Sequence, residues 1–210
     1  MLRLLLVRHG LTTANREDRW IGRTDPPLNE EGLAQARALA TRLAGEGLTA
    51  IYSSPQLRAR QTAELIARAC GLEVRIEPEL REMDFGCWEG LTQAEIELRY
   101  PGQMRAWWAN PTAEPAPHGG ETLTRVAQRA KAAYNKIVAR HSDGETVLIV
   151  AHAGVLQALL CEALGPPLRA RWTYLLKEAA LSELHIFNGQ PVLVSLNDVR
   201  HLHSCWRNGG

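Results

Sequence analysis

The chain has 210 residues, of which 45% are hydrophobic, and this is enough for one compact domain with a sizeable core. Its 24 Lys and Arg residues nearly balance 23 Asp and Glu, so the formal charge is +1 and no broad positive field is available to bind nucleic acid or an acidic membrane. We therefore predict a single domain over residues 1–210, with a core of about 1–200 and a tail over 201–210. Neither nucleic acid nor a membrane is an expected partner, and a homodimer is left open.

The apolar stretch at the N-terminus, Leu2–Val7, is interrupted by Arg3 and closed by Arg8. It is too short for the core of a signal peptide or for a bilayer span. The four cysteines are scattered with no paired spacing, which suggests neither a zinc site nor a disulfide framework. We expect a cytoplasmic protein with no bound metal.

Short apolar runs alternate with longer stretches of helical period, a pattern typical of strands joined by crossover helices. The fold class is therefore α/β with a parallel sheet. Leu2–Val7 is the first predicted strand. A loop through Leu28 follows, which is long enough to be functional. Asn29 caps the first predicted helix, whose first turn is acidic.

Thr49–Ser53 is the second predicted strand. Ser54 is placed to cap the next helix, with Pro55 at its first position, where the missing N–H group costs nothing. That helix is predicted to run to Gly71.

A short third strand contains Val74 and Ile76. The irregular stretch Pro78–Gly90 that follows is dense in charged residues, which is typical of a site. Thr92 and Glu95 then form the capping box of another helix.

The segment Met104–Trp108 and the loop Pro111–Gly120 are predicted to form a lid or insertion outside the sheet. Trp107 and Trp108 are either core anchors or part of a substrate pocket. His118 is interpreted as a loop residue, with contact to substrate as the alternative.

The last part of the chain returns to alternating elements. They are an amphipathic helix over Leu123–Val138, a central strand over Thr146–Val150, a helix over Ala153–Leu164, and strands over Leu184–Phe187 and Val192–Leu196. Asn188 and Gly189 join the last two strands, which predicts a hairpin and an antiparallel edge of the sheet.

Ligands of open α/β sheets bind outside the carboxyl ends of the strands. Arg8 and His9 follow the first strand, Arg58 lies one turn into the helix after the second, and His152 follows the Thr146–Val150 strand. We therefore expect two histidines and two arginines to share one crevice.

This set of side chains suits phosphoryl transfer without a metal. A neutral imidazole such as that of His9 is a nucleophile toward phosphorus. The guanidinium groups of Arg8 and Arg58, with a protonated His152, would hold the oxygens of the phosphoryl group. Asn15 could donate a further hydrogen bond.

The leaving alkoxide needs a proton, and the irregular stretch after the third strand carries the carboxyl groups that can supply it. We select Glu82 as the general acid and base. Asp84 and Glu89 are rivals that the sequence separates poorly.

Each residue also has an interpretation that involves no function. A histidine near a strand end is commonly a hydrogen-bonded core residue. Arg58 could be a surface charge beside Arg60, and Glu82 could pair with Arg81 in the loop.

The residues Leu5–Gly10, which read LLVRHG, resemble the signature of the histidine phosphatase superfamily, also called the phosphoglycerate mutase-like family. Further blocks resemble those of the family in the same order, and the resemblance covers nearly the whole chain. They are Thr13 to Asn15, TDPPLNEEGLAQA from Thr24, SSPQLRARQTA from Ser53, REMDFGCWEG from Arg81, GGET from Gly119 and VAHAG from Val150.

The resemblance implies a three-layer α/β/α sandwich with a mostly parallel sheet and an antiparallel edge, and it assigns roles to individual residues. It implies that His9 becomes phosphorylated and that Glu82 is the proton donor. It implies contacts to the phosphoryl group from Arg8, Arg58, His152, Asn15 and the backbone of Gly22. Arg23, which follows Gly22, and Ala153, which follows His152, are added as candidates for substrate binding.

Within the family, DFGCWEG and the ending LNDVRHL are similar to the small phosphatase branch, especially alpha-ribazole phosphatases. This implies a hydrolase with no cofactor that acts on a small phosphorylated metabolite, with alpha-ribazole 5'-phosphate of cobalamin biosynthesis as the candidate. One alternative is a cofactor-dependent phosphoglycerate mutase, although mutases differ where Asp84 and Phe85 stand. The other is a non-catalytic binder of a phosphorylated ligand with the same fold.

Overall fold

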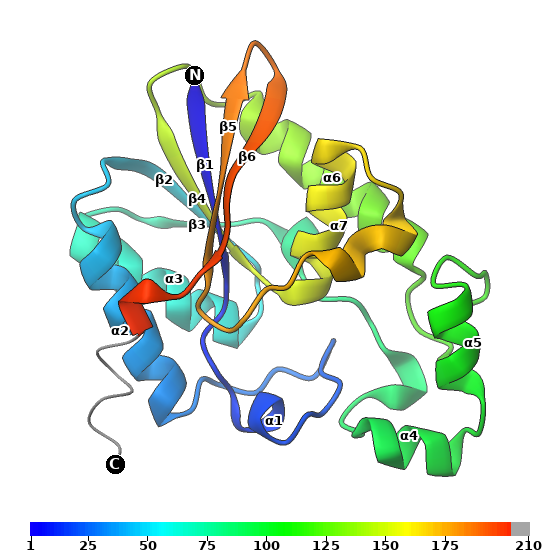
Figure 1. Cartoon of the computed structure of the whole chain (residues 1–210). Coiled ribbons are helices and arrows are strands. Elements are labelled where there is room, and N and C mark those ends of the chain that lie inside the picture. The colour runs from blue at the N-terminus through cyan, green and yellow to red at the C-terminus, as the bar shows by residue number, and fades with distance from the viewer. Residues whose placement is uncertain (203–210) are drawn as a thin grey trace.

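The computed structural model describes residues 1–202 and contains a six-stranded sheet of order β3-β2-β4-β1-β5-β6 (Figure 1). Its strands are β1 (Leu2–Arg8), β2 (Leu48–Ser53), β3 (Val74–Ile76), β4 (Thr146–Ala151), β5 (Leu181–Phe187) and β6 (Gln190–Asp198). Strands β1 to β4 are parallel, β5 is antiparallel to β1, and β6 is antiparallel to β5. The predicted sheet with an antiparallel edge is confirmed. Residues 203–210 of the predicted tail lie outside the described residues.

Helices cover both faces of the sheet, with α2 and α3 on one face and α6 and α7 on the other (Figure 1). The α-helices are α1 (Thr13–Arg16), α2 (Glu30–Leu43), α3 (Leu57–Cys70), α4 (Gln93–Arg99), α5 (Gln103–Ala109), α6 (Leu123–Val138) and α7 (Ala153–Leu164). Short 3-10 turns are η1 (Pro78–Leu80), η2 (Gly86–Trp88), η3 (Leu168–Thr173) and η4 (Arg200–Leu202). Helices α4 and α5 lie beyond the carboxyl ends of the parallel strands, outside the three layers. Within residues 1–202, no helix has the length and apolar character needed to cross a bilayer.

The two faces of the sheet bury different residues of the same strand. Along β1, Leu4 and Leu6 belong to the apolar cluster under α6 and α7, whereas Leu5 and Val7 belong to the cluster under α2 and α3. All residues of β4 are buried, as expected for a central strand covered on both faces. Packing on both faces fixes the register of β1 and β4, and therefore the positions of the residues that follow them.

Two predicted helix starts are confirmed by their caps. The Asn29 side chain accepts a hydrogen bond from the Gly32 amide at 2.8 Å at the start of α2. At α4, Thr92 and Glu95 exchange both hydrogen bonds of a capping box. Because these caps are local, the sequence alone locates them.

The predicted start of α3 is wrong. The helix begins at Leu57 rather than at Pro55, and Gln56 is its N-cap. The Ser54 hydroxyl lies 2.8 Å from Nε2 of His152 at the end of β4. The same hydroxyl accepts from the Gln56 amide at 3.3 Å. It therefore caps the turn before α3 and also joins two strand ends, and the local pattern cannot reveal the second contact.

The turn between β5 and β6 has the predicted form. Asn188 and Gly189 have φ values of 50° and 79°, the left-handed conformation that a two-residue hairpin turn requires. Strand β6 is consequently the antiparallel edge of the sheet.

Candidate active site

The site lies where β1 and β4 end. These neighbouring parallel strands pair Arg8 with Ala151, so the next residues, His9 and His152, emerge at the same edge of the sheet. Their ring centroids are 5.0 Å apart. The structure therefore brings together the two histidines that the sequence placed in one crevice.

The His9 ring is fixed in one tautomer. Its Nδ1 lies 2.7 Å from the Gly10 carbonyl oxygen, which can only accept, so Nδ1 carries the proton and Nε2 keeps its lone pair. His9 is 3% exposed. Burial lowers its pKa well below 6.5, and the charges of Arg58 and Arg8 lower it further. The His9 ring is thus neutral, with an unprotonated Nε2 that could act as a nucleophile.

His152 is also buried and neutral. Burial lowers its pKa well below 6.5, and the charges of Arg58 and His9 add to the shift. Burial beside arginines therefore favours a neutral His152, since a buried charge there is disfavoured. The protonated His152 expected beside a phosphoryl group stays a prediction. Its Nε2 contacts Ser54, whereas its buried Nδ1 has no hydrogen-bond partner among residues 1–202. With the Ser54 hydroxyl donating to Nε2, Nδ1–H is a donor for a ligand.

Arg8 is held by the segment before β5. Its Nη1 donates to the Leu176 carbonyl oxygen at 2.8 Å, and its Nη2 lies 2.6 Å from a carboxylate oxygen of Glu178. Its Nε is buried and lacks a partner in the described part of the chain. Arg8 therefore combines an ion pair that fixes the guanidinium with an N–H group that can bind a ligand.

Arg58 is buried at 1% exposure and is not a surface charge. Its Nη1 donates to the Thr24 carbonyl oxygen at 3.0 Å and its Nη2 to the Gly22 carbonyl oxygen at 3.3 Å. Burial lowers its pKa, which the charges of Glu82 and Asp25 partly offset. The loop after β1 thus positions a cation from α3 beside His9.

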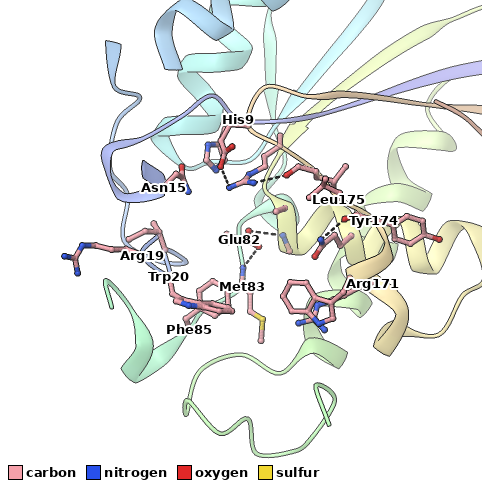
Figure 2. Close-up of a pocket in the computed structure, with 18 of the residues that line it drawn as sticks. His9, Asn15, Arg19, Trp20, Glu82, Met83, Phe85, Arg171, Tyr174 and Leu175 are labelled. Atoms are coloured by element: carbon pink, nitrogen blue, oxygen red, sulfur yellow. Dashed lines mark hydrogen bonds and ion pairs between the residues drawn. The ribbon is translucent and has the colours of Figure 1, made fainter. Parts of the chain in front are cut away.

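Glu82 lies at the N-terminus of α7. One carboxylate oxygen, Oε1, accepts from the amides of Met83 at 2.9 Å and Val155 at 3.2 Å, and the other, Oε2, accepts from the Gly154 amide at 3.0 Å. The carboxylate therefore replaces a side-chain cap, which His152, the N-cap residue, does not provide. Glu82 lines the same cavity as His9, in the centre of the view in Figure 2.

The rival carboxyl groups are engaged elsewhere. Asp84 accepts from the Gly86 amide at 2.9 Å and pairs with Arg23 at 3.0 Å. Glu89 accepts from the amides of Gly22, Arg23 and Thr24 in the loop after β1. It also accepts from the Phe85 amide. Neither lines the cavity that contains His9. The geometry favours Glu82.

Gly154 allows the close approach of Glu82 to α7. A Cβ atom at this position would lie 2.6 Å from Oε1 of Glu82, so the carboxyl group would have to move. We expect Gly154→Ala to lower turnover of phosphomonoesters by about 100-fold, the cost of misplacing a catalytic group by roughly 1 Å. Steady-state kinetics with p-nitrophenyl phosphate and an alkyl phosphate would measure the loss.

Gly45→Ala is the matched control, because an added Cβ there meets no atom within 4 Å. Wild-type turnover in Gly154→Ala would contradict the assigned position of Glu82. Thermal unfolding of both variants separates a shifted side chain from a damaged fold.

Among the predicted substrate-binding residues, Asn15 and Ala153 line the cavity. Oδ1 of Asn15 accepts from the Thr12 amide and hydroxyl, at 3.2 and 2.8 Å. Its amide nitrogen is consequently the end that can donate to a ligand. Ala153 is the first residue of α7, so its N–H group lies at the positive end of the helix.

Gly22 and Arg23 lie outside the lining of this cavity, and the contacts to substrate predicted for them stay predictions. The Gly22 amide is bound to Glu89, and its carbonyl oxygen accepts from Arg58. Arg23 is exposed and paired with Asp84, beside a neighbouring cavity. Glu89 accepts from the amides of Gly22, Arg23 and Thr24, and this part of the loop supports Arg58.

The cavity has a volume of about 490 Å³, and indole rings line its side away from His9. Trp20 lies there in Figure 2, and its ring centroid is 5.4 Å from that of Trp107. Trp107 is 2% exposed and also lines the cavity, so it is both a core anchor and part of the pocket wall. Trp108 does not line it and stacks on Trp172 at 4.5 Å.

His118 is a loop residue, as predicted, and it is buried. Its ring packs 4.9 Å from Trp88, and its Nδ1 accepts from the Gly120 amide at 3.1 Å. Burial lowers its pKa. It does not line the cavity, so it supports the aromatic wall from behind.

Among the cavity residues that sequence reasoning missed are Arg171, Trp172 and Glu178. All come from the segment between α7 and β5, which carries no motif. The stretch RARWTY contains adjacent arginine and tryptophan residues, but a buried arginine cannot be distinguished there from a surface one. Within residues 1–202, no group of three His, Cys, Asp or Glu side chains is arranged to hold a metal ion.

The neutral histidines predict a dependence of stability on pH. In the unfolded chain His9 and His152 titrate near their ordinary pKa of 6.5, whereas in the folded chain both pKa values are well below this. Below pH 6.5 the unfolded chain binds more protons, so the free energy of unfolding falls as the pH falls. Each histidine is expected to contribute a loss of about 1.4 kcal/mol per pH unit.

Urea unfolding between pH 7.5 and pH 5.5 would measure this effect. His152→Gln, which removes one of the two titrating groups, should show a shallower decline. Equal slopes in the two proteins would contradict a neutral buried His152.

The profile described as "Histidine phosphatase superfamily (branch 1)" matches residues 4–199. Phosphoserine phosphatase 1 of Hydrogenobacter thermophilus is 37% identical over 202 residues, covering 96% of this chain and 95% of that protein. Glucosyl-3-phosphoglycerate phosphatase of Mycobacterium tuberculosis is 37% identical over 177 residues, covering 81% and 78%.

A solved structure agrees with the fold. The alpha-ribazole phosphatase from Shigella flexneri superposes with a TM-score of 0.83 at 30% identity, covering 93% of this chain and 96% of that one. The similarity therefore extends over the whole sheet and both helical layers.

Proposed function

Because the chain belongs to the histidine phosphatase superfamily (branch 1), we propose that it hydrolyses a small phosphomonoester through a phosphohistidine formed on His9. It is a phosphoric monoester hydrolase, the class of its named relatives. One observation carries the mechanism. The Nε2 lone pair of His9 is free, and two buried donors nearby lack partners among residues 1–202. They are Nε of Arg8, the preceding residue, and Nδ1 of His152, whose ring centroid lies 5.0 Å from that of His9.

In the first step, Nε2 of His9 attacks phosphorus as the bond from phosphorus to the ester oxygen breaks. Arg8, Arg58 and the Nδ1–H of His152 stabilise the charge on the phosphoryl oxygens. A protonated Glu82 gives its proton to the leaving oxygen. Because Oε1 already accepts two amides and Oε2 only one, Oε2 is the oxygen that carries this proton.

In the second step, the Glu82 carboxylate removes a proton from water. The water oxygen attacks phosphorus, the bond between nitrogen and phosphorus breaks, and phosphate leaves. Glu82 regains its proton and His9 its lone pair, so the cycle closes without an external reductant, oxidant or cofactor.

Three substrate types are supported by different observations. Phosphoserine and glucosyl-3-phosphoglycerate are suggested by the names of relatives with substantial identity. Alpha-ribazole 5'-phosphate is suggested by the structural similarity and by an aromatic wall, Trp20 and Trp172, on which a planar base can stack.

The experiment is hydrolysis of p-nitrophenyl phosphate and of a panel of phosphorylated metabolites in the presence of a chelator. We expect release of inorganic phosphate to be insensitive to the chelator. Failure to release phosphate from every compound would contradict the proposal. With 3-phosphoglycerate, release of phosphate indicates hydrolysis, whereas formation of 2-phosphoglycerate indicates a mutase.

A further inference from the structure

Arg171, in turn η3, is a buried cation that forms no ion pair among residues 1–202, although the charge of Glu82 acts on it from across the cavity. Its side chain is 2% exposed, and Nη1 has no hydrogen-bond partner among the described residues. None of the ion pairs or side-chain hydrogen bonds within residues 1–202 involves its guanidinium. Every other site arginine has a carboxylate or carbonyl oxygen in contact, so Arg171 is the exception.

Two indole rings hold the guanidinium in place. Its Cζ lies 4.7 Å from the ring centroid of Trp107 and 4.0 Å from that of Trp172, and the two rings are nearly perpendicular. Contact with the ring faces partly replaces the lost hydration. It does not satisfy the N–H groups, and burial lowers the pKa of Arg171 to about 10. An unpaired buried charge is costly, which favours occupation by an anion.

Arg171 lines the same cavity as Arg8, His9, Arg58 and Glu82. In Figure 2 it lies on the side of the pocket away from His9, with Glu82 between them. A substrate that places its phosphoryl group at His9 and its leaving oxygen at Glu82 therefore directs its remaining atoms toward Arg171.

We propose that Arg171 binds a second anionic group, a carboxylate or a phosphate, of the phosphomonoester whose phosphoryl group lies at His9. A planar guanidinium with free N–H groups suits either anion by bidentate contact. This inference rests on the proposed function and narrows its substrates. It ranks phosphorylated amino acids, phosphorylated hydroxy acids and bisphosphates above alpha-ribazole 5'-phosphate, which has no second anionic group.

Matched substrate pairs test the proposal in the wild-type enzyme. Phosphoserine and phosphoethanolamine differ by a carboxylate, and fructose 1,6-bisphosphate and fructose 6-phosphate differ by a phosphate. We expect kcat/KM to favour the member with the second anion by about 30-fold or more in at least one pair, the effect of a buried charge pair. The pair with the larger ratio identifies the anion.

Arg171→Met should reduce the ratio of kcat/KM between the two members of that pair to near one. The main change should be a higher KM for the substrate with the second anion. Arg171→Lys, which keeps the charge, should retain part of it. Arg169→Met is the matched control, because it removes an exposed arginine from the same turn and should leave the ratio unchanged. Thermal unfolding checks that the variants are folded.

The outcomes separate this inference from the proposed function. If wild-type enzyme hydrolyses none of the four compounds, nor p-nitrophenyl phosphate, the proposed function fails. If it hydrolyses them with both ratios near one, or prefers alpha-ribazole 5'-phosphate to all of them, the role of Arg171 is overturned whether or not the variants fold. A large ratio that survives in folded Arg171→Met also overturns it.

Discussion

Replacing His9 with alanine is expected to lower turnover of every phosphomonoester about ten-thousandfold or more, because it removes the nucleophile on which both steps depend. The neighbouring cations and Glu82 can still bind and polarise the substrate, but no covalent intermediate forms. The loss should appear in kcat, since the groups that bind the phosphoryl oxygens are retained.

Rapid acid-free quenching followed by mass spectrometry would locate the phosphoryl group on the wild-type protein. We expect it on His9, with no phosphorylated peptide in His9→Ala. His185→Ala is the matched control, because this histidine pairs with Glu183 on β5 and does not line the cavity. Phosphate on another side chain, or turnover retained in His9→Ala, would refute the mechanism.

Glu82→Gln is expected to slow the hydrolysis of alkyl phosphates by about 100- to 10,000-fold, the range for loss of a general acid or base. The amide cannot protonate a leaving alkoxide or accept a proton from water. The loss in the first step should be smaller for p-nitrophenyl phosphate, whose leaving group needs no proton. Phosphorylated His9 should then accumulate, because attack by water becomes the slow step.

Burst kinetics with p-nitrophenyl phosphate would detect this accumulation, and Asp84→Asn provides the control. Asp84 is a carboxyl group in the same irregular stretch that pairs with Arg23 outside the cavity. We expect Asp84→Asn to retain most of the activity on alkyl phosphates. If Glu82→Gln and Asp84→Asn lost equal activity on alkyl phosphates, the assignment of proton transfer to Glu82 would be wrong.

Much of the fold was predictable because its signals are local. The spacing of apolar residues located the strands, Asn29 and Thr92 marked helix starts, and Asn188 with Gly189 marked the hairpin. The start of α3 was predicted two residues early, and the contact of the Ser54 hydroxyl with His152 across the sheet was not predictable. Local patterns identify a group that can cap a turn or helix, but they do not reveal a distant partner for it.

The sequence by itself determined that His9 and His152 follow strands of one parallel sheet, because neighbouring parallel strands end at a common edge. Only the tertiary structure decided which N–H groups remain available to a ligand. Glu89 occupies the amides around Gly22, and Glu178 pairs with Arg8, whereas Arg171 packs against two indole rings and forms no ion pair among residues 1–202. The physical reason is that the ionic and hydrogen-bonding partners of these groups come from segments far apart in the chain, so no spacing in the sequence encodes which of them are satisfied.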